Sequence, residues 1–314
     1  MNSMSQSIFV LQFMLYKIHY PYITFVIDSP QSIDSFFQQF HLSKKTIHLY
    51  KQNKEYTVNK RFVSSTSLLV KGDRLTIKAF QEDDGMYPPN YQDLDIVYED
   101  DFILVINKPP FLNVFPDHKE KVNSLANRVA GYYIQQGYNI PVRFIHRLDY
   151  ETSGLVLFCK CAFIQPLLDY QLSIKEISRH YLAVVEGQIK DKHTSIIDKP
   201  IGRDRHHNQK MRISETGKRA QTQVQCLSST NEYSFLYCSL FTGRKHQIRV
   251  HLSSKGHPIV GDQLYGTKSS LINRQALHAY ELQLVHPITK EKMVFHQTPP
   301  DDMLSLIHMI DPYF

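Results

Sequence analysis

The chain has 314 residues, with 36 lysines and arginines against 30 acidic residues, so its formal net charge is +6. This length exceeds that of one average domain and predicts one large and one small domain. The hydrophobic share of 42% predicts a packed core and excludes a disordered chain. The basic charge is compatible with nucleic acid as a partner but does not by itself indicate one.

The cysteines and histidines show no metal-binding spacing. The four cysteines contain no Cys-x-x-Cys pair, and the 16 histidines contain no His-Glu-x-x-His segment. Cys159 and Cys161 lie in a strand-like run, where both are expected to be small buried residues. We therefore expect reduced thiols in a reducing compartment and no metal.

The apolar run from Ile8 to Tyr16 is interrupted by Gln12. It is shorter than the roughly 20 residues that span a bilayer, and it lacks a preceding basic flank and a small-residue cleavage site. We therefore expect a soluble, cytoplasmic protein without a membrane partner, for which Met14 is an alternative start.

Residues 1–80 are expected to form a small basic domain. Helices are predicted over 32–40 and 43–50, and strands over 56–59 and 67–77 around a Gly72-Asp73 turn. From Lys44 to Lys78 there are nine lysines and arginines against two acidic residues, a local net charge of +7, so the basic character is concentrated here. This surface either binds RNA or is a solvated basic face without that role.

Residues 81–93 are rich in polar and turn residues, including Asp83-Asp84-Gly85, and are expected to form a linker. Residues 94–314 are expected to form the second domain. Its predicted strands are 103–106, 155–158, 182–185 and 221–226, and its predicted helices begin at Ser124 and at Gly243. Because strands outnumber helices and do not alternate strictly with them, we predict an α+β fold with a mixed, largely antiparallel sheet.

One carboxylate, Asp149, stands beside the basic pair His146-Arg147, and Gly154 and an apolar run follow it. A carboxylate among cations stays ionised, and in a cleft it can act as a nucleophile or a base. In isolation, such an Asp is more often a turn or helix cap. The segment resembles the His-Arg-Leu-Asp signature of the RluA-type pseudouridine synthases, which convert uridine to pseudouridine in RNA.

Three further stretches resemble the same family in the same chain order, so the resemblance covers nearly all of the second domain. They are 105–116 with Asn107-Lys108-Pro109-Pro110, 179–187 with Tyr181, and 242–266 with Arg249. Phe115 stands where the family usually has His, and Arg179 where it usually has Lys. Four matches in order make a chance resemblance very improbable.

The first domain resembles the S-four-type (αL) RNA-binding domain that often precedes this catalytic domain. The matching landmarks are Ser43-Lys44-Lys45, Val58-Asn59-Lys60 and Gly72-Asp73-Arg74-Leu75. This second resemblance covers only that segment. It implies a pseudouridine synthase fold preceded by a small RNA-binding domain.

The family resemblance implies roles for three residues. Asp149 would be the catalytic carboxylate, Arg249 its cationic partner, and Tyr181 the residue that stacks on the target base. A guanidinium can hold a carboxylate by two parallel hydrogen bonds. Isomerisation breaks an N-glycosidic bond, and a carboxylate can stabilise or trap the resulting positive charge. The sequence leaves open whether Asp149 attacks the sugar, removes the 2′ proton or attacks the ring. The reaction needs no cofactor.

Basic residues are expected to contact the RNA. His146 and Arg147 would assist the flipping of the target uridine or contact phosphate. The loop 203–212 matches a loop that grips RNA in the family, although a solvated loop is the alternative. The residues expected to bind RNA are His146, Arg147, Arg203, Arg205, Lys210, Arg212, Arg244, Lys44 and Lys45.

We therefore predict a monomeric RNA pseudouridine synthase acting on specific sites in structured RNA, with ribosomal RNA favoured over transfer RNA. The alternative is a non-catalytic RNA-binding or ribosome-assembly protein on the same fold, which loss of Asp149, Tyr181 or Arg249 would favour; all three are present. A glycoside hydrolase is less well supported, because no motif positions a second carboxylate.

Overall fold

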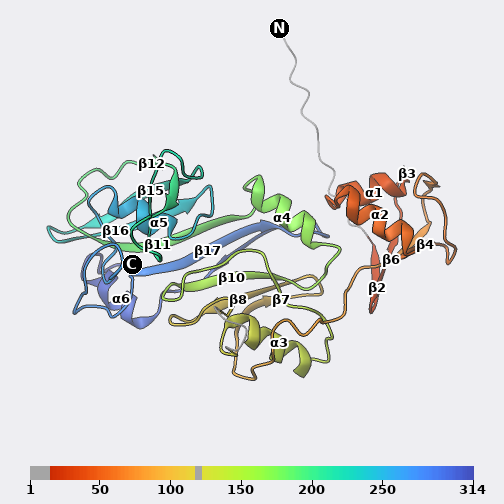
Figure 1. The fold of residues 1–314 in the computed structure, drawn as a ribbon, viewed down its shortest axis with the longest axis horizontal. Helices are drawn as coiled ribbons and strands as arrows, with labels where there is room; N and C mark the ends of the chain where they lie inside the picture. The colour runs from red at the N-terminus through yellow and green to blue at the C-terminus, as the bar shows by residue number, and fades with distance from the viewer. Residues whose placement is uncertain (1–14, 117–121) are drawn as a thin grey trace, which may run out of the picture.

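The computed structural model describes residues 15–116 and 122–314, which form a smaller N-terminal domain and a larger sheet domain (Figure 1). Most of the apolar run from Ile8 to Tyr16 lies outside the described residues. Within the described part of the chain, no helix is long and apolar enough to cross a membrane.

The N-terminal domain is an antiparallel sheet with two helices beside it (Figure 1). Its strands, in spatial order, are β1 (Tyr16–His19), β2 (Tyr22–Val26), β6 (Arg74–Lys78) and β4 (Tyr56–Val58). The remaining elements are α1 (Ile33–Gln39), α2 (Lys44–Gln52) and the short pair β3 (Gln31–Ser32) and β5 (Leu68–Leu69).

Both helices of this domain begin where the sequence predicts. Ser32 and Ser43 are the N-caps, and each side chain accepts a hydrogen bond of 3.1 Å from the backbone N–H three residues later. Strands β1 and β2 are not predicted above. In β2 the fully buried Ile23 and Phe25 alternate with less buried residues, as expected for a half-buried strand.

The larger domain is built on a ten-stranded sheet. Strand β10 pairs in parallel with β17, whereas the other strand pairs of this sheet are antiparallel, which confirms the mixed, largely antiparallel fold. Its main path is β12 (Ser195–Asp198), β15 (Gln221–Ser229), β16 (Tyr233–Leu240), β11 (Ser178–Glu186), β17 (Leu277–Val285), β10 (Ser153–Cys159), β8 (Ile103–Lys108) and β7 (Asp95–Glu99). Beside this path, β18 (Lys292–His296) pairs with β17, and β9 (Arg143–Phe144) pairs with β10.

The helices of this domain are α3 (Leu125–Gln135), α4 (Gln165–Ser173), α5 (Gln247–Ser253) and α6 (Asp301–His308). Helix α3 begins at the predicted cap Ser124, which forms a capping box with Asn127. The predicted start of α5 at Gly243 is wrong. His246 has a left-handed backbone with φ of 57°, so regular helix begins only after it.

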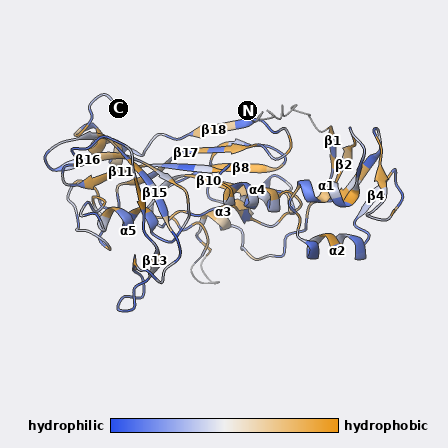
Figure 2. Ribbon diagram, turned by 90° about the horizontal axis from the view of Figure 1, so that it is seen from above, coloured by the Kyte–Doolittle hydropathy of each residue, from blue (hydrophilic) through white to orange (hydrophobic). Residues whose placement is uncertain are grey.

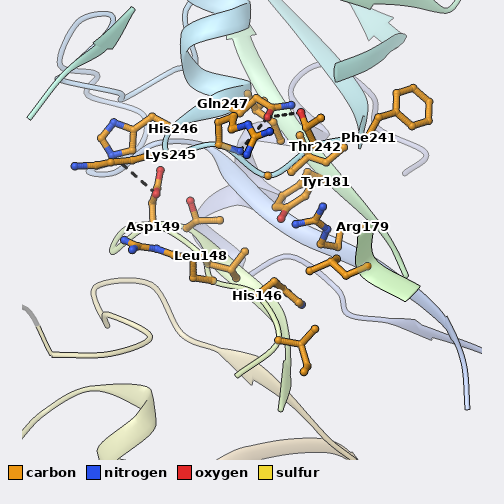
Figure 3. A pocket seen from close by; sticks show the side chains of 18 of the residues that line it. His146, Leu148, Asp149, Arg179, Tyr181, Phe241, Thr242, Lys245, His246 and Gln247 are labelled. Carbon is orange, nitrogen blue, oxygen red and sulfur yellow. Dashed lines mark hydrogen bonds and ion pairs between the residues drawn. The ribbon is translucent and has the colours of Figure 1, made fainter. Parts of the chain in front are cut away.

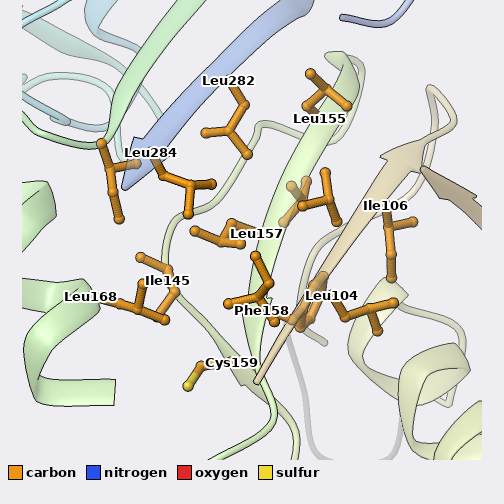
Figure 4. Close-up of a cluster of buried hydrophobic side chains, with 14 of the residues drawn as sticks. Leu104, Ile106, Ile145, Leu155, Leu157, Phe158, Cys159, Leu168, Leu282 and Leu284 are labelled. Atoms are coloured by element: carbon orange, nitrogen blue, oxygen red, sulfur yellow. The ribbon is translucent and has the colours of Figure 1, made fainter. Parts of the chain in front are cut away.

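Strand β10 is buried along its whole length, and it anchors the core. Figure 4 shows its side chains packed with those of β8 and β17 and with Leu168 of α4. Burial on both faces explains why this segment reads as a continuous apolar run rather than an alternating one.

The two domains share one hydrophobic core. Phe163, which follows β10, inserts its ring among aromatic residues of the N-terminal domain, with its ring centroid 4.7 Å from that of Phe40. Its backbone N–H donates to the carbonyl of Ala79 at 3.1 Å. Between the domains, residues 81–93 contain no helix or strand, and they pack on α3, where Gly131 leaves room for the Asn90 backbone.

Candidate active site

A pocket of about 720 Å³ lies between the segment that precedes β10, the start of β11 and the segment that leads into α5. Six residues that the sequence selects line this pocket, namely Asp149, Tyr181, Arg249, His146, Arg147 and Arg244. The structure therefore brings together side chains that are up to about a hundred residues apart in the chain. Figure 3 shows the Asp149 carboxylate directed toward His246, with Tyr181 and Arg179 side by side elsewhere in the pocket.

Asp149 lies in a turn between β9 and β10, closed by a 3.1 Å hydrogen bond from the Thr152 N–H to the Asp149 carbonyl. Gly154 then lies opposite Ala279 in the parallel pairing of β10 with β17. Its φ is +109°, and a Cβ there would lie 2.3 Å from the carbonyl oxygen of Ala279. Only glycine adopts this positive φ readily and also lacks the Cβ that would clash with Ala279, which explains its place in the motif.

Lys108 fixes the back of this turn. Its side chain is fully buried, which lowers its pKa to about 7, and its Nζ donates to the carbonyls of Pro109 (2.8 Å), Leu112 (2.8 Å) and Tyr150 (3.3 Å). The sequence places Lys108 in a family motif but does not reveal this role. Because one bond reaches the residue after Asp149, Lys108 restrains the position of the carboxylate.

Arg249, on α5, contacts Asp149 as predicted, but by one hydrogen bond rather than two. Its Nη1 donates to Asp149 Oδ2 at 3.0 Å. The two-pronged pairing is with Asp262, through Nε at 2.7 Å and Nη2 at 2.8 Å. Burial opposes the charge of Arg249, but its hydrogen bonds to Asp262 and the nearby Asp149 outweigh burial and raise its pKa. The guanidinium therefore stays charged between the two carboxylates.

Asp262 is fully buried, and the sequence shows it only as part of a motif. Besides Arg249, its Oδ1 accepts backbone N–H bonds from Leu264 (3.0 Å) and Tyr265 (3.2 Å). These bonds anchor Asp262, which in turn holds Arg249 in place for Asp149. No single-sequence signal relates these residues, because their contact is made only in the fold.

Tyr181 is 4% exposed and faces the pocket from β11. Burial raises its pKa; Arg179 opposes the rise and Asp149 adds to it, so the hydroxyl stays neutral. A buried ring with a neutral hydroxyl can stack on a flat base and donate a hydrogen bond to it.

His246 lies on the other side of Asp149, with Nε2 3.9 Å from Asp149 Oδ1. Burial lowers its pKa to about 4, and Arg249 and Lys245 also oppose its charge, so it is neutral near pH 7. Its Nδ1 lies 2.9 Å from the hydroxyl of Tyr265, which also accepts a 2.7 Å bond from the Met211 N–H. The sequence assigns no role to His246 or Tyr265.

The residues selected for RNA contact fall into three places. His146 is buried in the pocket wall, whereas Arg147 is exposed at the rim, with its guanidinium 4.5 Å from the ring centre of Phe115. Arg244 is exposed and donates to the Arg219 carbonyl at 2.9 Å.

The remaining basic residues lie outside the pocket lining. Arg203, Arg205, Lys210 and Arg212 belong to the hairpin of β13 (Ile201–Arg203) and β14 (Met211–Ile213). Figure 2 shows this hairpin projecting from the larger domain with a hydrophilic tip. Lys44 and Lys45 are exposed on α2 of the N-terminal domain. Among the described residues there is no cluster of three or more His, Cys, Asp or Glu side chains that could hold a metal ion.

Two protein-family models match the chain. Residues 102–254 match RNA pseudouridylate synthase, and residues 23–75 match the N-terminal domain of the RluD ribosomal pseudouridine synthase. The first match contains Asp149, Tyr181 and Arg249, and the second contains most of the basic segment of the N-terminal domain.

Individual proteins that resemble this chain carry names consistent with these two family models. An uncharacterized RNA pseudouridine synthase of Bacillus subtilis, YhcT, is 41% identical over 84% of this chain and 88% of its own length. Ribosomal large subunit pseudouridine synthase D of Yersinia pestis is 37% identical over 81% of this chain and 82% of its own length. Among solved structures, human RNA pseudouridylate synthase domain containing 1 is 27% identical, with a TM-score of 0.56 over 68% of this chain and 87% of that one.

Proposed function

Since the chain belongs to the RNA pseudouridine synthase family, we propose that it converts uridine to pseudouridine in ribosomal RNA with Asp149 as its catalytic carboxylate. The observation that carries this role is the pairing of Asp149 with the buried Arg249 inside the pocket. Two of the curated relatives, from Yersinia pestis and Nitrosomonas europaea, are named for the large ribosomal subunit, which supports that RNA as the target.

The geometry of Asp149 suits an attacking or proton-accepting group. Arg249 occupies Oδ2, while Oδ1 has no hydrogen bond to any residue in the described part of the chain. Isomerisation breaks the bond between N1 of uracil and the anomeric carbon, turns the base, and joins its C5 to that carbon. An ionised Oδ1 can trap the sugar or accept its 2′ proton while the bond breaks.

Tyr181 and the basic residues complete the proposal. Tyr181 would stack on the extruded base, and its neutral hydroxyl would donate a hydrogen bond to that base. Arg147, exposed at the rim, would occupy the gap that the flipped base leaves in the RNA. The hairpin β13–β14 and the basic N-terminal domain would bind RNA phosphates.

We also propose that the protein acts as a monomer in the cytoplasm. The support for the compartment is its thiols: all four cysteines are free and buried. Unpaired thiols persist in a reducing compartment.

Asp149→Asn tests the catalytic role. The amide keeps the shape but cannot act as a nucleophile or base, so tritium release from a large-subunit ribosomal RNA transcript labelled at C5 of uridine should fall at least about 100-fold. Binding of the same transcript should be unchanged. Asp169→Asn, which alters another carboxylate in the pocket lining, is the matched control and should stay active. Near-normal release by Asp149→Asn would contradict the assignment.

A further inference from the structure

Arg179 is a largely buried cation with no hydrogen bond or ion pair to any described residue. The residue is 9% exposed, and its Nε is buried without a hydrogen bond. Burying an unpaired charge costs several kcal/mol, so such groups are normally satisfied by a carboxylate, a ligand or a metal. Arg179 lines the pocket, which indicates that its partner arrives with the substrate.

His146 offers a second unpaired donor to the same pocket. Its Nε2 accepts a 3.3 Å hydrogen bond from the Leu157 N–H. Burial lowers its pKa to about 3, with the charge of Arg179 adding to the effect, so the ring is neutral. Its one proton is therefore on Nδ1, which is buried and has no partner.

The fold presents Arg179 beside the residue proposed to hold the base. Arg179 and Tyr181 alternate with His180 on β11, so both side chains point to the pocket face, about 7 Å apart along the strand. Figure 3 shows the two side chains next to each other. Gly243 leaves the necessary space, because a Cβ there would lie 3.0 Å from Nη1 of Arg179.

We propose that Arg179, supported by His146, binds the O4 carbonyl oxygen of the target uracil and is the residue that distinguishes uracil from cytosine. Uracil presents acceptors at O2 and O4, whereas cytosine replaces the O4 acceptor with an amino donor. If cytosine were bound, its amino group would face the buried guanidinium, and neither of these donors would have an acceptor. Sites that leave buried polar groups unpaired in this way reject the wrong base strongly. The inference rests on the proposed function, because it places a uracil in this pocket.

A phosphate oxygen of the RNA is the other acceptor that could satisfy a guanidinium. The two sources differ in measurable ways. A phosphate contact contributes about 0.7–0.9 to the slope of log affinity against log salt, whereas a contact to a neutral carbonyl does not. A carbonyl contact instead makes the reaction sensitive to replacement of that oxygen by sulfur, which is a weaker acceptor.

The experiment compares ribosomal RNA transcripts that carry tritium at C5 and contain uracil, 2-thiouracil or 4-thiouracil throughout. The wild-type protein should favour uracil over 4-thiouracil in kcat/KM, whereas a preference against 2-thiouracil instead would contradict the discrimination from cytosine. Arg179→Gln should lower kcat/KM on uracil at least tenfold and bring that preference close to one, with an unchanged salt slope of RNA binding. Arg179→Lys, which keeps a charged donor, should retain part of the preference.

Arg128→Gln is the matched control, because Arg128 also has a buried Nε without a partner but lies on α3, away from this pocket. It should keep the wild-type preference. An Arg179→Gln protein that keeps the preference, or that loses salt slope instead, overturns the inference. Unfolding temperatures of all variants exclude a folding defect as the cause. Absence of tritium release by the wild-type protein is a separate result, and it would overturn the proposed function itself.

Discussion

Arg249 holds two carboxylates with one guanidinium. Two of its nitrogens pair with the buried Asp262, and the third donates to Asp149. This geometry needs a planar group with several donors at fixed angles, which a lysine ammonium does not have. Asp262 therefore acts as the anchor and Asp149 as the exposed partner, since their side chains are 0% and 20% exposed.

Arg249→Lys should therefore inactivate the protein although the charge is kept. A lysine can reach one carboxylate at a time, so either Asp262 is left buried without its partner or Asp149 loses its orientation. We expect kcat to fall more than about tenfold, which corresponds to about 1.4 kcal/mol. Single-turnover tritium release at saturating RNA measures the effect. A turnover equal to wild type would show that Asp149 is held by another residue.

The hairpin β13–β14 is connected to the site through Tyr265. The Met211 N–H can only donate, so the Tyr265 oxygen accepts it and directs its own proton to Nδ1 of His246. Burial raises the pKa of Tyr265 to about 12, which keeps that proton in place. The Nε2 proton of the neutral His246 then points toward Asp149. If the hairpin binds RNA as proposed, these hydrogen bonds would link that contact to the position of Asp149.

Tyr265→Phe should lower kcat/KM about 30-fold while leaving the fold intact. The ring still covers the Arg249 guanidinium, but the hydrogen bonds to Met211 and His246 are lost, at a cost of about 1 kcal/mol each. Tyr98→Phe is the control, because it removes a hydroxyl bonded to Asp100 outside the pocket lining. Equal activity losses in the two variants would contradict a specific role for Tyr265.

Elements with local signals were predictable from the sequence. The starts of α1, α2 and α3 are marked by serine caps that bond within their own first turn. The start of α5 was not predictable in this way, because the left-handed backbone of His246 accompanies its distant contact with Tyr265. Tertiary contacts of this kind leave no trace in local periodicity.

The candidate site likewise contains residues that the sequence reveals and residues whose contacts only the fold reveals. The meeting of Asp149 and Arg249 in one pocket follows from the resemblance of their motifs to one family. Asp262 and Lys108 also stand in those motifs, but their hydrogen-bond partners are set by the fold, so no spacing in one sequence reveals them.

The protein as a whole should be unstable in acid because several histidines are buried in neutral form. Burial lowers the pKa of His146 to about 3, and of His246 and His278 to about 4. In the unfolded chain they titrate near pH 6.5, so the unfolded state binds more protons between about pH 6.5 and 4. Their contribution to stability is complete above pH 6.5 and is lost as the pH falls.

At pH 5 each of these histidines should cost about 2 kcal/mol relative to pH 7. Denaturant unfolding at the two pH values measures the sum. His278→Gln should flatten the dependence, because His278 is buried between Ser153 and the Gln297 carbonyl, away from the pocket lining. Equal unfolding free energy at both pH values would show that these rings are protonated in the folded protein.

The shared core decides how the N-terminal domain can be tested. Removing that domain would expose Phe163, which packs against Phe25, Phe37, Phe40 and Tyr50. It would also remove the Ala79 carbonyl that accepts from the Phe163 N–H. Lost stability would then be confused with lost RNA binding, so substitution of exposed charges is the cleaner test.

The double variant Lys44→Gln, Lys45→Gln should weaken RNA binding without changing chemistry at saturating RNA. Both side chains are exposed at the start of α2, and neither lines the pocket. If each lysine contacts a phosphate, the slope of log affinity against log salt should fall by about 0.7–0.9 per residue. Lys190→Gln, Lys192→Gln removes the same charge from another exposed segment and should leave the slope unchanged. If the slope of the Lys44, Lys45 variant equals that of wild type, α2 is not part of the RNA interface, and the basic surface of this domain is only a solvated face.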